Sequence, residues 1–173
     1  MDLKAKFRHV MDFPKAGIDF IDITTVLQDK DALRQSIEEM KRLAGELGEF
    51  DLVVGPESRG FIFGAPLAYA LGKGFVPIRK KGKLPYKTVS IEYQLEYGTD
   101  TLEIHEDAVQ PGQRVVIVDD LLATGGTIES NIKLVEKLGG EVAGLVFLVE
   151  LGYLGGRGKL KGYNVKTVVC FDH

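Results

Sequence analysis

Apolar residues recur at three- and four-residue spacing in the segment 29–48, which is the spacing of one face of a helix. The positions that share this face are Leu33, Ile37, Met40, Leu43 and Leu47. Asp31 stands where a side chain can cap the first helical turn. The pattern therefore predicts an amphipathic helix over most of 29–48.

Further along the chain the apolar residues form short continuous runs bounded by glycine, proline or charged residues. Such runs predict strands that are buried on both faces of a sheet. They are "DLVVGPE" (51–57), "GFVPIR" (74–79), "QRVVIVDD" (113–120), "EVAGLVFLVEL" (141–151) and "NVKTVVCF" (164–171).

Helical patterns separate several of these runs. "FIFGAPLAYALG" (61–72) predicts a helix of small residues. A second helix follows residue 126, with Glu129 and Lys133 paired at i, i+4 on its outer side. Its apolar face carries Ile128, Ile132, Val135 and Leu138. Strands that alternate with helices predict an α/β fold with a mainly parallel sheet covered on both faces.

Three segments have other patterns. "KKGKLPYKT" (80–88) is basic and contains glycine and proline, which predicts a mobile surface loop. The stretch 89–105 alternates loosely around a Tyr-Gly break, which predicts two antiparallel strands. "GYLGGRGKLKGY" (152–163) is rich in glycine and predicts a loop.

Length and composition limit the class of protein. A chain of 173 residues is most simply one domain over 1–173, and a net charge of −3 argues against nucleic-acid binding by bulk electrostatics. Cys170 is the single cysteine, so no internal disulfide can form and a cytoplasmic location is expected. No apolar stretch approaches the roughly 20 residues of a membrane span, so no membrane partner is expected.

The stretch "VVIVDDLLATGGTI" (115–128) carries the most informative chemistry. Four aliphatic residues lead directly into Asp119 and Asp120, and small residues and hydroxyls follow before a helix. In open α/β sheets ligands bind beyond the carboxyl ends of the strands. Free N–H groups at a helix N-terminus favour an anion, and carboxylates accept hydrogen bonds from sugar hydroxyls. The stretch therefore predicts a cradle for a ribose 5-phosphate.

Two common nucleotide-binding motifs do not fit the chain. "GPESRGFI" (55–62) has both glycines of a Walker loop, but Phe61-Ile62 stand where Lys and Ser or Thr are needed. No G-x-G-x-x-G opens the first helix, so a dinucleotide fold is unsupported.

"VVIVDDLLATGGT" resembles the phosphoribosyl-pyrophosphate signature of the type I phosphoribosyltransferases. With "FPKAGIDFIDIT" (13–24), "SRGFIFGAPLA" (58–68) and the segment 79–105, nearly the whole chain resembles the adenine phosphoribosyltransferase family in order and spacing. The resemblance implies the type I phosphoribosyltransferase fold, with a small N-terminal hood at about 1–30 and a mobile β-hairpin lid at about 80–102. It also implies a homodimer.

The implied reaction transfers ribose 5-phosphate from phosphoribosyl pyrophosphate to N9 of adenine, giving AMP and pyrophosphate. Mg²⁺ would be bound through the pyrophosphate and ribose and not in a protein cage, and the sequence has no cluster of metal-ligating residues.

Roles toward phosphoribosyl pyrophosphate follow from the matching motifs. Asp119 and Asp120 would bind the ribose hydroxyls, and Ser58 and Arg59 the pyrophosphate, at a turn that in the family contains a cis peptide matching Glu57–Ser58. The 5-phosphate would be bound by Ala123, Thr124, Gly125, Gly126 and Thr127.

The resemblance implies further roles for the lid and the hood. Lys83 would close over the pyrophosphate, Arg79 would reach a neighbouring subunit's pyrophosphate, and Glu96 would share a proton with the purine. Arg59, Lys83 and Glu96 form the implied catalytic set. Adenine would be bound by Asp19, Phe20, Ile21 and Leu151, the first three reading it through the backbone.

Each feature also has a simpler interpretation. Asp119 and Asp120 could be a helix cap and its solvated neighbour, Arg59 a surface ion pair, and Glu96 an exposed glutamate. The basic loop could be merely solvated, and Phe20 could be core of the hood.

Rival functions also remain open. A phosphoribosyltransferase for a 6-oxopurine is one, and a regulatory sensor that binds phosphoribosyl pyrophosphate without turnover is another. A nucleotide hydrolase is disfavoured, because the sequence offers neither a metal cage nor a water-activating base.

Overall fold

The computed structural model describes residues 1–95 and 97–173, and the chain divides into two compact units, Met1–Glu39 and Met40–His173. The division falls inside helix α2 (Lys30–Gly45). The organisation as one domain with a hood of about 30 residues stays a prediction.

The smaller unit is built around a two-stranded antiparallel sheet of β1 (Arg8–Met11) and β2 (Asp19–Asp22). A short 3-10 helix, η1 (Leu3–Lys6), precedes this sheet, and α1 (Thr24–Leu27) follows it.

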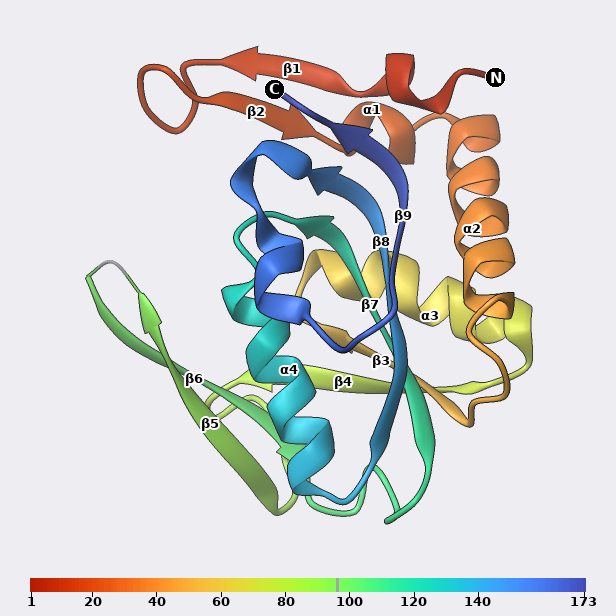
Figure 1. Ribbon diagram of the computed structural model, residues 1–173, viewed down its shortest axis with the longest axis vertical. Helices are drawn as coiled ribbons and strands as arrows, with labels where there is room; N and C mark the ends of the chain where they lie inside the picture. Colours follow the sequence, from red (N-terminus) through yellow and green to blue (C-terminus); the bar gives the residue numbers. More distant parts are fainter. Residues whose placement is uncertain (96) are drawn as a thin grey trace. The chain divides into compact units, whose positions relative to one another are not determined.

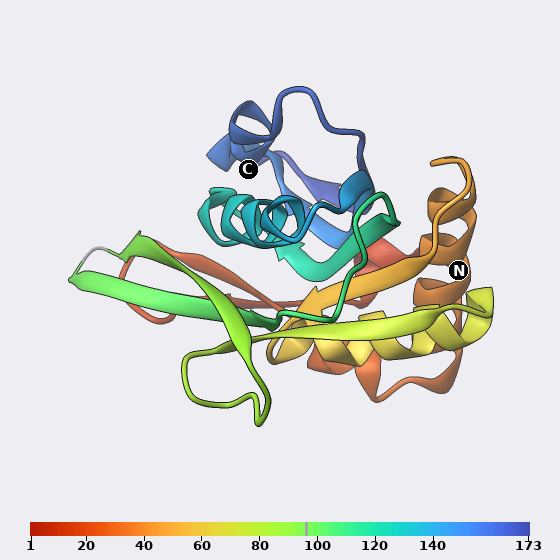
Figure 2. The same cartoon turned by 90° about the horizontal axis from the view of Figure 1, so that it is seen from below.

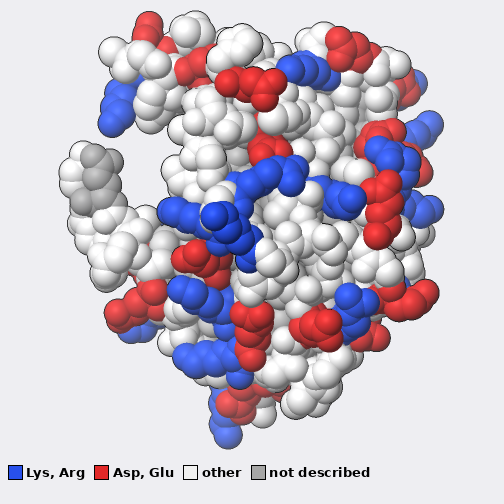
Figure 3. Space-filling view, in the orientation of Figure 1, with Lys and Arg blue, Asp and Glu red and all other residues white. Residues whose placement is uncertain are grey.

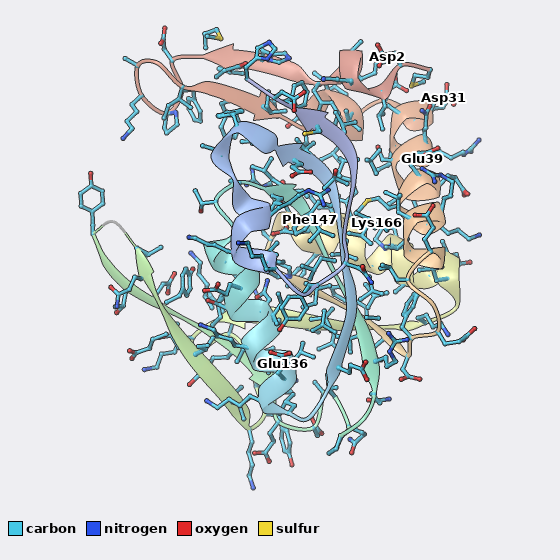
Figure 4. All side chains as sticks on the ribbon, in the orientation of Figure 1. Asp2, Asp31, Glu39, Glu136, Phe147 and Lys166 are labelled. Atoms are coloured by element: carbon cyan, nitrogen blue, oxygen red, sulfur yellow. The ribbon has the colours of Figure 1, made fainter. Side chains whose placement is uncertain are left out.

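Helix α2 occupies the segment predicted from its apolar spacing, but its cap differs from the prediction. Asp29 Oδ1 accepts hydrogen bonds from the backbone N–H groups of Asp31 and Ala32, at 2.9 and 3.1 Å. Asp31 itself lies in the first turn of the helix (Figure 4). The expectation that Asp31 caps the helix is therefore wrong, because only the residue outside the first turn can reach those N–H groups.

The five apolar runs of the larger unit form the parallel part of a seven-stranded sheet (Figure 1). In spatial order these strands are β4 (Gly74–Lys80), β3 (Leu52–Pro56), β7 (Arg114–Leu122), β8 (Glu141–Leu151) and β9 (Val165–Phe171). Every neighbouring pair among them is parallel, which confirms the mainly parallel sheet.

The loosely alternating stretch forms the predicted antiparallel pair, β5 (Thr88–Leu95) and β6 (Gly98–His105). β6 also pairs antiparallel with β4, at Arg79 and Lys80, so the hairpin extends the sheet at its β4 edge. Figure 1 shows the hairpin projecting away from that edge.

Two helices cover opposite faces of the sheet, α3 (Arg59–Leu71) on one and α4 (Gly126–Lys137) on the other (Figures 1 and 2). The aliphatic strand residues are buried between them, and Phe147 of β8 is fully buried (Figure 4). The predicted pair Glu129–Lys133 is present on α4, with Nζ and Oε1 3.7 Å apart.

The glycine-rich segment 152–163 is more regular than predicted. It contains two 3-10 helices, η2 (Gly152–Leu154) and η3 (Gly156–Leu160), and Leu160 is buried in the core between α4 and the sheet. Among the residues that the structure describes, no helix has the length and apolar character needed to cross a bilayer.

Candidate active site

A cavity of about 460 Å³ opens beyond the carboxyl ends of β3 and β7. Two strand-to-helix turns supply most of its wall, and β4 and β5 add one residue each. Its lining is Glu57, Ser58, Arg59, Lys80, Tyr93 and the continuous run 119–128. This is where parallel α/β sheets bind their ligands.

The turn between β7 and α4 presents a helix N-terminus to the cavity. Gly125 is the N-cap of α4 and adopts φ 91°, a left-handed conformation that glycine adopts without strain. The first N–H groups of a helix have no partner within it, and the helix dipole adds positive potential there. The turn is therefore suited to an anion such as a phosphate.

Asp119 and Asp120 lie at the end of β7 beside this turn, and both line the cavity. Asp120 is 3% exposed, and its backbone N–H donates to Asp119 Oδ1 at 2.8 Å. Burial, and next the negative charge of Asp120, raise the pKa of Asp119 well above its ordinary value, while Arg59 acts in the opposite direction. Two adjacent carboxylates at one strand end, with Asp120 buried and Asp119 half-buried, repel each other in the free protein, and such a pair in a cavity is a candidate functional site.

The charge of Arg59 partly compensates the carboxylates. Its Nε lies 3.0 Å from Asp120 Oδ2, although no N–H is aligned to donate to that oxygen. Asp120 Oδ2 is buried and accepts no hydrogen bond from the residues that the structure describes. A hydroxyl donor entering the cavity would satisfy it.

The turn between β3 and α3 faces the first turn across the cavity. The peptide bond between Glu57 and Ser58 is cis, as the family resemblance implies. Glu57 Oε1 accepts hydrogen bonds from Arg79 Nε at 3.1 Å and from the backbone N–H of Lys80 at 2.9 Å. This contact links the turn to the end of β4.

Sequence reasoning missed several lining residues, of which Glu57, Lys80 and Tyr93 carry polar groups. Tyr93 donates to Asp100 Oδ2 at 3.4 Å, and Lys80 Nζ lies 3.6 Å from the same oxygen. Burial, and next the charge of Asp100, raise the pKa of Tyr93. Lys80 belongs to the basic segment 80–88, from which the family resemblance singled out only Lys83, and the alternation of β5 did not tell which of its side chains would face the cavity.

Some predicted site residues are not part of this lining. Arg79 is directed to Glu57 and lies over the ring of Phe61, while Lys83 and Leu151 also lie outside the lining. Glu96 falls outside the described residues. The roles of these residues stay predictions.

The three predicted adenine-binding residues of the smaller unit are consecutive on β2. Asp19 Oδ2 lies 2.8 Å from His9 Nδ1, Phe20 packs edge-to-face against Phe13, and Ile21 is buried. Their role toward the base stays a prediction.

Within the described part of the chain, no three His, Cys, Asp or Glu side chains are grouped so as to hold a metal ion. The oxygens available to a hydrated cation at the cavity are those of the carboxylates of Glu57, Asp119 and Asp120. Such hard oxygen donors suit Mg²⁺ that keeps water and substrate oxygens.

A parallel α/β sheet whose strand-end cavity combines an anion-binding turn with paired carboxylates defines a protein that binds phosphorylated sugars. Residues 24–171 match the family model of the phosphoribosyl transferase domain. The adenine phosphoribosyltransferase of Acetivibrio thermocellus is 73% identical over 171 residues, covering 99% of this chain and 100% of that protein.

Solved structures agree with this assignment. Adenine phosphoribosyltransferase from Thermoanaerobacter pseudethanolicus is 60% identical, with a TM-score of 0.91 and 98% of each chain covered. The Saccharomyces cerevisiae protein, complexed with an imino-altritol bisphosphate and adenine, is 40% identical, with a TM-score of 0.92 and 96% of each chain covered. The chain therefore belongs to the phosphoribosyltransferase family, among its adenine phosphoribosyltransferases, and has the type I fold predicted from sequence.

Proposed function

We propose that the protein transfers the ribose 5-phosphate of phosphoribosyl pyrophosphate to N9 of adenine, giving AMP and pyrophosphate. The observation that carries this proposal is the pairing of the 123–127 turn with Asp119 and Asp120 in one cavity. The turn suits a phosphate and the carboxylates suit the hydroxyls of the sugar attached to it. The relatives that match over the full chain are adenine phosphoribosyltransferases.

In this reaction the bond from C1 of the ribose to pyrophosphate breaks, and pyrophosphate leaves with the electron pair. A bond from C1 to N9 of adenine forms, and N9 loses its proton. Positive charge develops on the ribose between these events. Asp119 and Asp120, which line the cavity beside the proposed ribose site, stabilise that charge electrostatically because their positions are fixed before the reaction.

The leaving group is a polyanion, and the opposite wall of the cavity carries cations. Ser58 and Arg59 bind the pyrophosphate at the start of α3, where free N–H groups add to the charge of the guanidinium. Lys80 reaches the same cavity from β4, and Lys83 closes over it with the lid. Glu96 shares the purine proton, in accordance with the family resemblance.

When bound together with phosphoribosyl pyrophosphate, Mg²⁺ would supply positive charge that offsets part of the negative charge of the leaving group. Asp119 and Asp120 are the residues of this chain that would hold its water ligands. Their oxygen chemistry fits a hard cation.

Asp19, Phe20 and Ile21 bind adenine through their backbone, and the family resemblance assigns Leu151 to the same base. The edge-to-face packing of Phe20 on Phe13 supports a rigid aromatic surface at this position, on which a purine can stack. The yeast relative, which was crystallised with adenine, supports the choice of base.

The active molecule is a homodimer. The outer face of α3 supports this assignment, because it carries apolar side chains that remain exposed in the single chain: Ile62, Ala65, Pro66 and Tyr69. A contiguous exposed apolar face is typical of an interaction surface. The free thiol of Cys170, the single cysteine, supports a cytoplasmic location.

The experiment that tests this function is a competition between bases. Purified protein, Mg²⁺ and phosphoribosyl pyrophosphate meet equal amounts of adenine, hypoxanthine, guanine and xanthine, and chromatography resolves the nucleotides formed. AMP should form far ahead of the others, and the Asp119→Ala, Asp120→Ala double variant should form none while keeping its circular dichroism spectrum. A 6-oxopurine nucleotide as the main product would overturn the base assignment. Tight binding of phosphoribosyl pyrophosphate without any product would favour the sensor.

A further inference from the structure

The segment η3 lies directly behind the turn that precedes α4, although about 30 residues separate the two in sequence. A Cβ at Gly125 would lie 2.8 Å from the carbonyl oxygen of Gly156, and a Cβ at Gly156 would overlap the carbonyl oxygen of Ala123. The two backbones are therefore packed against each other, and side chains of η3 are brought to the N-terminus of α4.

Lys159 is the side chain of η3 that reaches this N-terminus. Its Nζ lies 3.9 Å from the position that a Cβ on Gly126 would occupy, and Gly126 is the first residue of α4. In the part of the chain that the structure describes, Lys159 forms no ion pair and no hydrogen bond. Figure 3 shows Lys and Arg side chains gathered over this C-terminal segment.

This position of an ammonium group is electrostatically unfavourable in the protein alone. Helix N-termini carry partial positive charge and favour anions, whereas cations are favoured at C-termini. An unpaired lysine beside the N-terminus of α4 adds like charge to that potential. An anion bound between the ammonium group and the helix N-terminus would be attracted to both, so the repulsion would be replaced by attraction.

The backbone of η3 is fixed on both sides of Lys159. On one side Arg157 Nε donates to the buried Glu150 Oε2 at 2.8 Å, and Arg157 Nη1 donates to the carbonyl of Val165 at 3.1 Å. On the other side Leu160 is 1% exposed in the core. The lysine therefore starts from a rigid base, which lowers the entropy lost when its ammonium group binds a ligand.

We infer that Lys159 is a binding residue for the 5-phosphate of the substrate and of AMP, supplying the cation that the turn 123–127 lacks. The inference rests on the proposed function, because it takes the ligand of that turn to be a ribose 5-phosphate. Lys159 binds ground state and transition state alike, since the 5-phosphate does not change during the reaction.

The test uses two anionic probes that engage opposite walls of the cavity, ribose 5-phosphate and magnesium pyrophosphate, measured by titration calorimetry. Lys159→Met should weaken ribose 5-phosphate binding by roughly tenfold, the usual loss for a charge-assisted hydrogen bond, and leave pyrophosphate binding unchanged. Lys159→Arg should restore most of the affinity. Lys161→Met, an exposed lysine two residues away, is the matched control and should alter neither probe.

Steady-state kinetics give an independent measurement. Lys159→Met should raise the KM for phosphoribosyl pyrophosphate by about the same factor with kcat within roughly twofold, because uniform binding is lost. Unchanged ribose 5-phosphate affinity in Lys159→Met would overturn the inference while leaving the proposed function intact. Equal losses of ribose 5-phosphate affinity in Lys159→Met and Lys161→Met would also overturn it. So would equal losses of affinity for ribose 5-phosphate and for pyrophosphate in Lys159→Met. Either result would reflect the general surface charge and not a contact with the 5-phosphate. Wild-type protein that neither binds ribose 5-phosphate nor forms AMP would overturn the proposed function and the inference together.

Discussion

At the scale of single residues, Asp119 shows how the site works against the stability of the fold. Its folded-state pKa is raised above the ordinary value of 3.8, so the folded protein holds this proton at pH values where the unfolded chain has lost it. The contribution of Asp119 to the free energy of unfolding therefore falls as pH rises from 3.8 through the raised folded-state pKa. The two carboxylates serve ligand binding, although their mutual repulsion lowers the free energy of unfolding.

We expect Asp119→Asn to lose turnover but to melt at a higher temperature than the wild type above this pH window. The difference should vanish near pH 3.5 and grow as pH rises, by roughly 2–4 °C for each kcal/mol of repulsion removed. Melting curves by calorimetry between pH 3.5 and 9 measure it. The control is Asp107→Asn, at an exposed aspartate outside the cavity, which should show no such trend. A pH-independent difference for Asp119→Asn would contradict the electrostatic explanation.

The sequence predicts site residues well where they are adjacent in the chain. Asp119, Asp120 and the turn 123–127 form one continuous motif whose chemistry can be read without a structure. Lys80 and Tyr93 could not be predicted in this way, because they reach the cavity only through the pairing of β4 with β6 and of β6 with β5. The proximity of Lys159 to the N-terminus of α4 was not predictable either, because a glycine-rich segment has no periodic pattern that tells where it packs.

At the scale of elements, the backbone contact between η3 and the turn 123–125 predicts a position-specific effect of alanine. Gly156→Ala would place a methyl group against the carbonyl of Ala123 and the side chain of Leu122. We expect it to destabilise the protein by about 1–3 kcal/mol, as overpacking does, and to raise the KM for phosphoribosyl pyrophosphate. Urea denaturation and steady-state kinetics measure the two effects.

The same short helix supplies the matched control. A Cβ at Gly158 would have no neighbour within 4 Å, and neither Gly156 nor Gly158 has a positive φ. Gly158→Ala should therefore stay within about 0.5 kcal/mol of the wild type with an unchanged KM. Similar losses in both variants would mean that η3 itself, and not its contact with the turn, is sensitive to alanine.

The elements themselves were predictable where burial alone determines them. The runs that became β3, β4, β7, β8 and β9 are apolar because both faces of the sheet are covered. Their ends were less predictable. β7 continues to Leu122, beyond the two aspartates, because Leu122 is buried and pairs with Glu150 of β8, a contact that lies outside any local pattern.

At the scale of the whole molecule, the exposed face of α3 predicts a dimer. Tyr69 is 90% exposed and Ile62 39% exposed, both on the side of the helix that faces away from the sheet. A stable interface buries about 1,200–2,000 Å² in total, so this face would form its apolar centre and neighbouring surfaces its rim. A second copy of the chain is a suitable partner, because twofold symmetry packs the apolar face of α3 in one copy against the same face in the other.

The double variant Ile62→Glu, Tyr69→Glu should place four like charges in that centre and dissociate the dimer. By sedimentation equilibrium we expect the wild type at twice the chain mass of 19.0 kDa and the variant at 19.0 kDa. Tyr86→Glu, at an exposed tyrosine on the loop between β4 and β5, should stay dimeric. A wild type that sediments at the mass of one chain, or a double variant that stays dimeric, would contradict this use of α3.

Dissociation also tests the assignment of Arg79 to a neighbouring subunit's pyrophosphate. Within its own chain this side chain is directed to Glu57 and lies outside the cavity lining, so a role at a second cavity requires a second copy. The dissociated variant should then bind ribose 5-phosphate like the wild type, because that cavity lies within one chain, but lose much of its affinity for magnesium pyrophosphate. Arg79→Ala in the intact dimer should show the same selective loss. Full pyrophosphate affinity in the dissociated variant would instead assign pyrophosphate binding to Ser58, Arg59 and the lysines of the same chain.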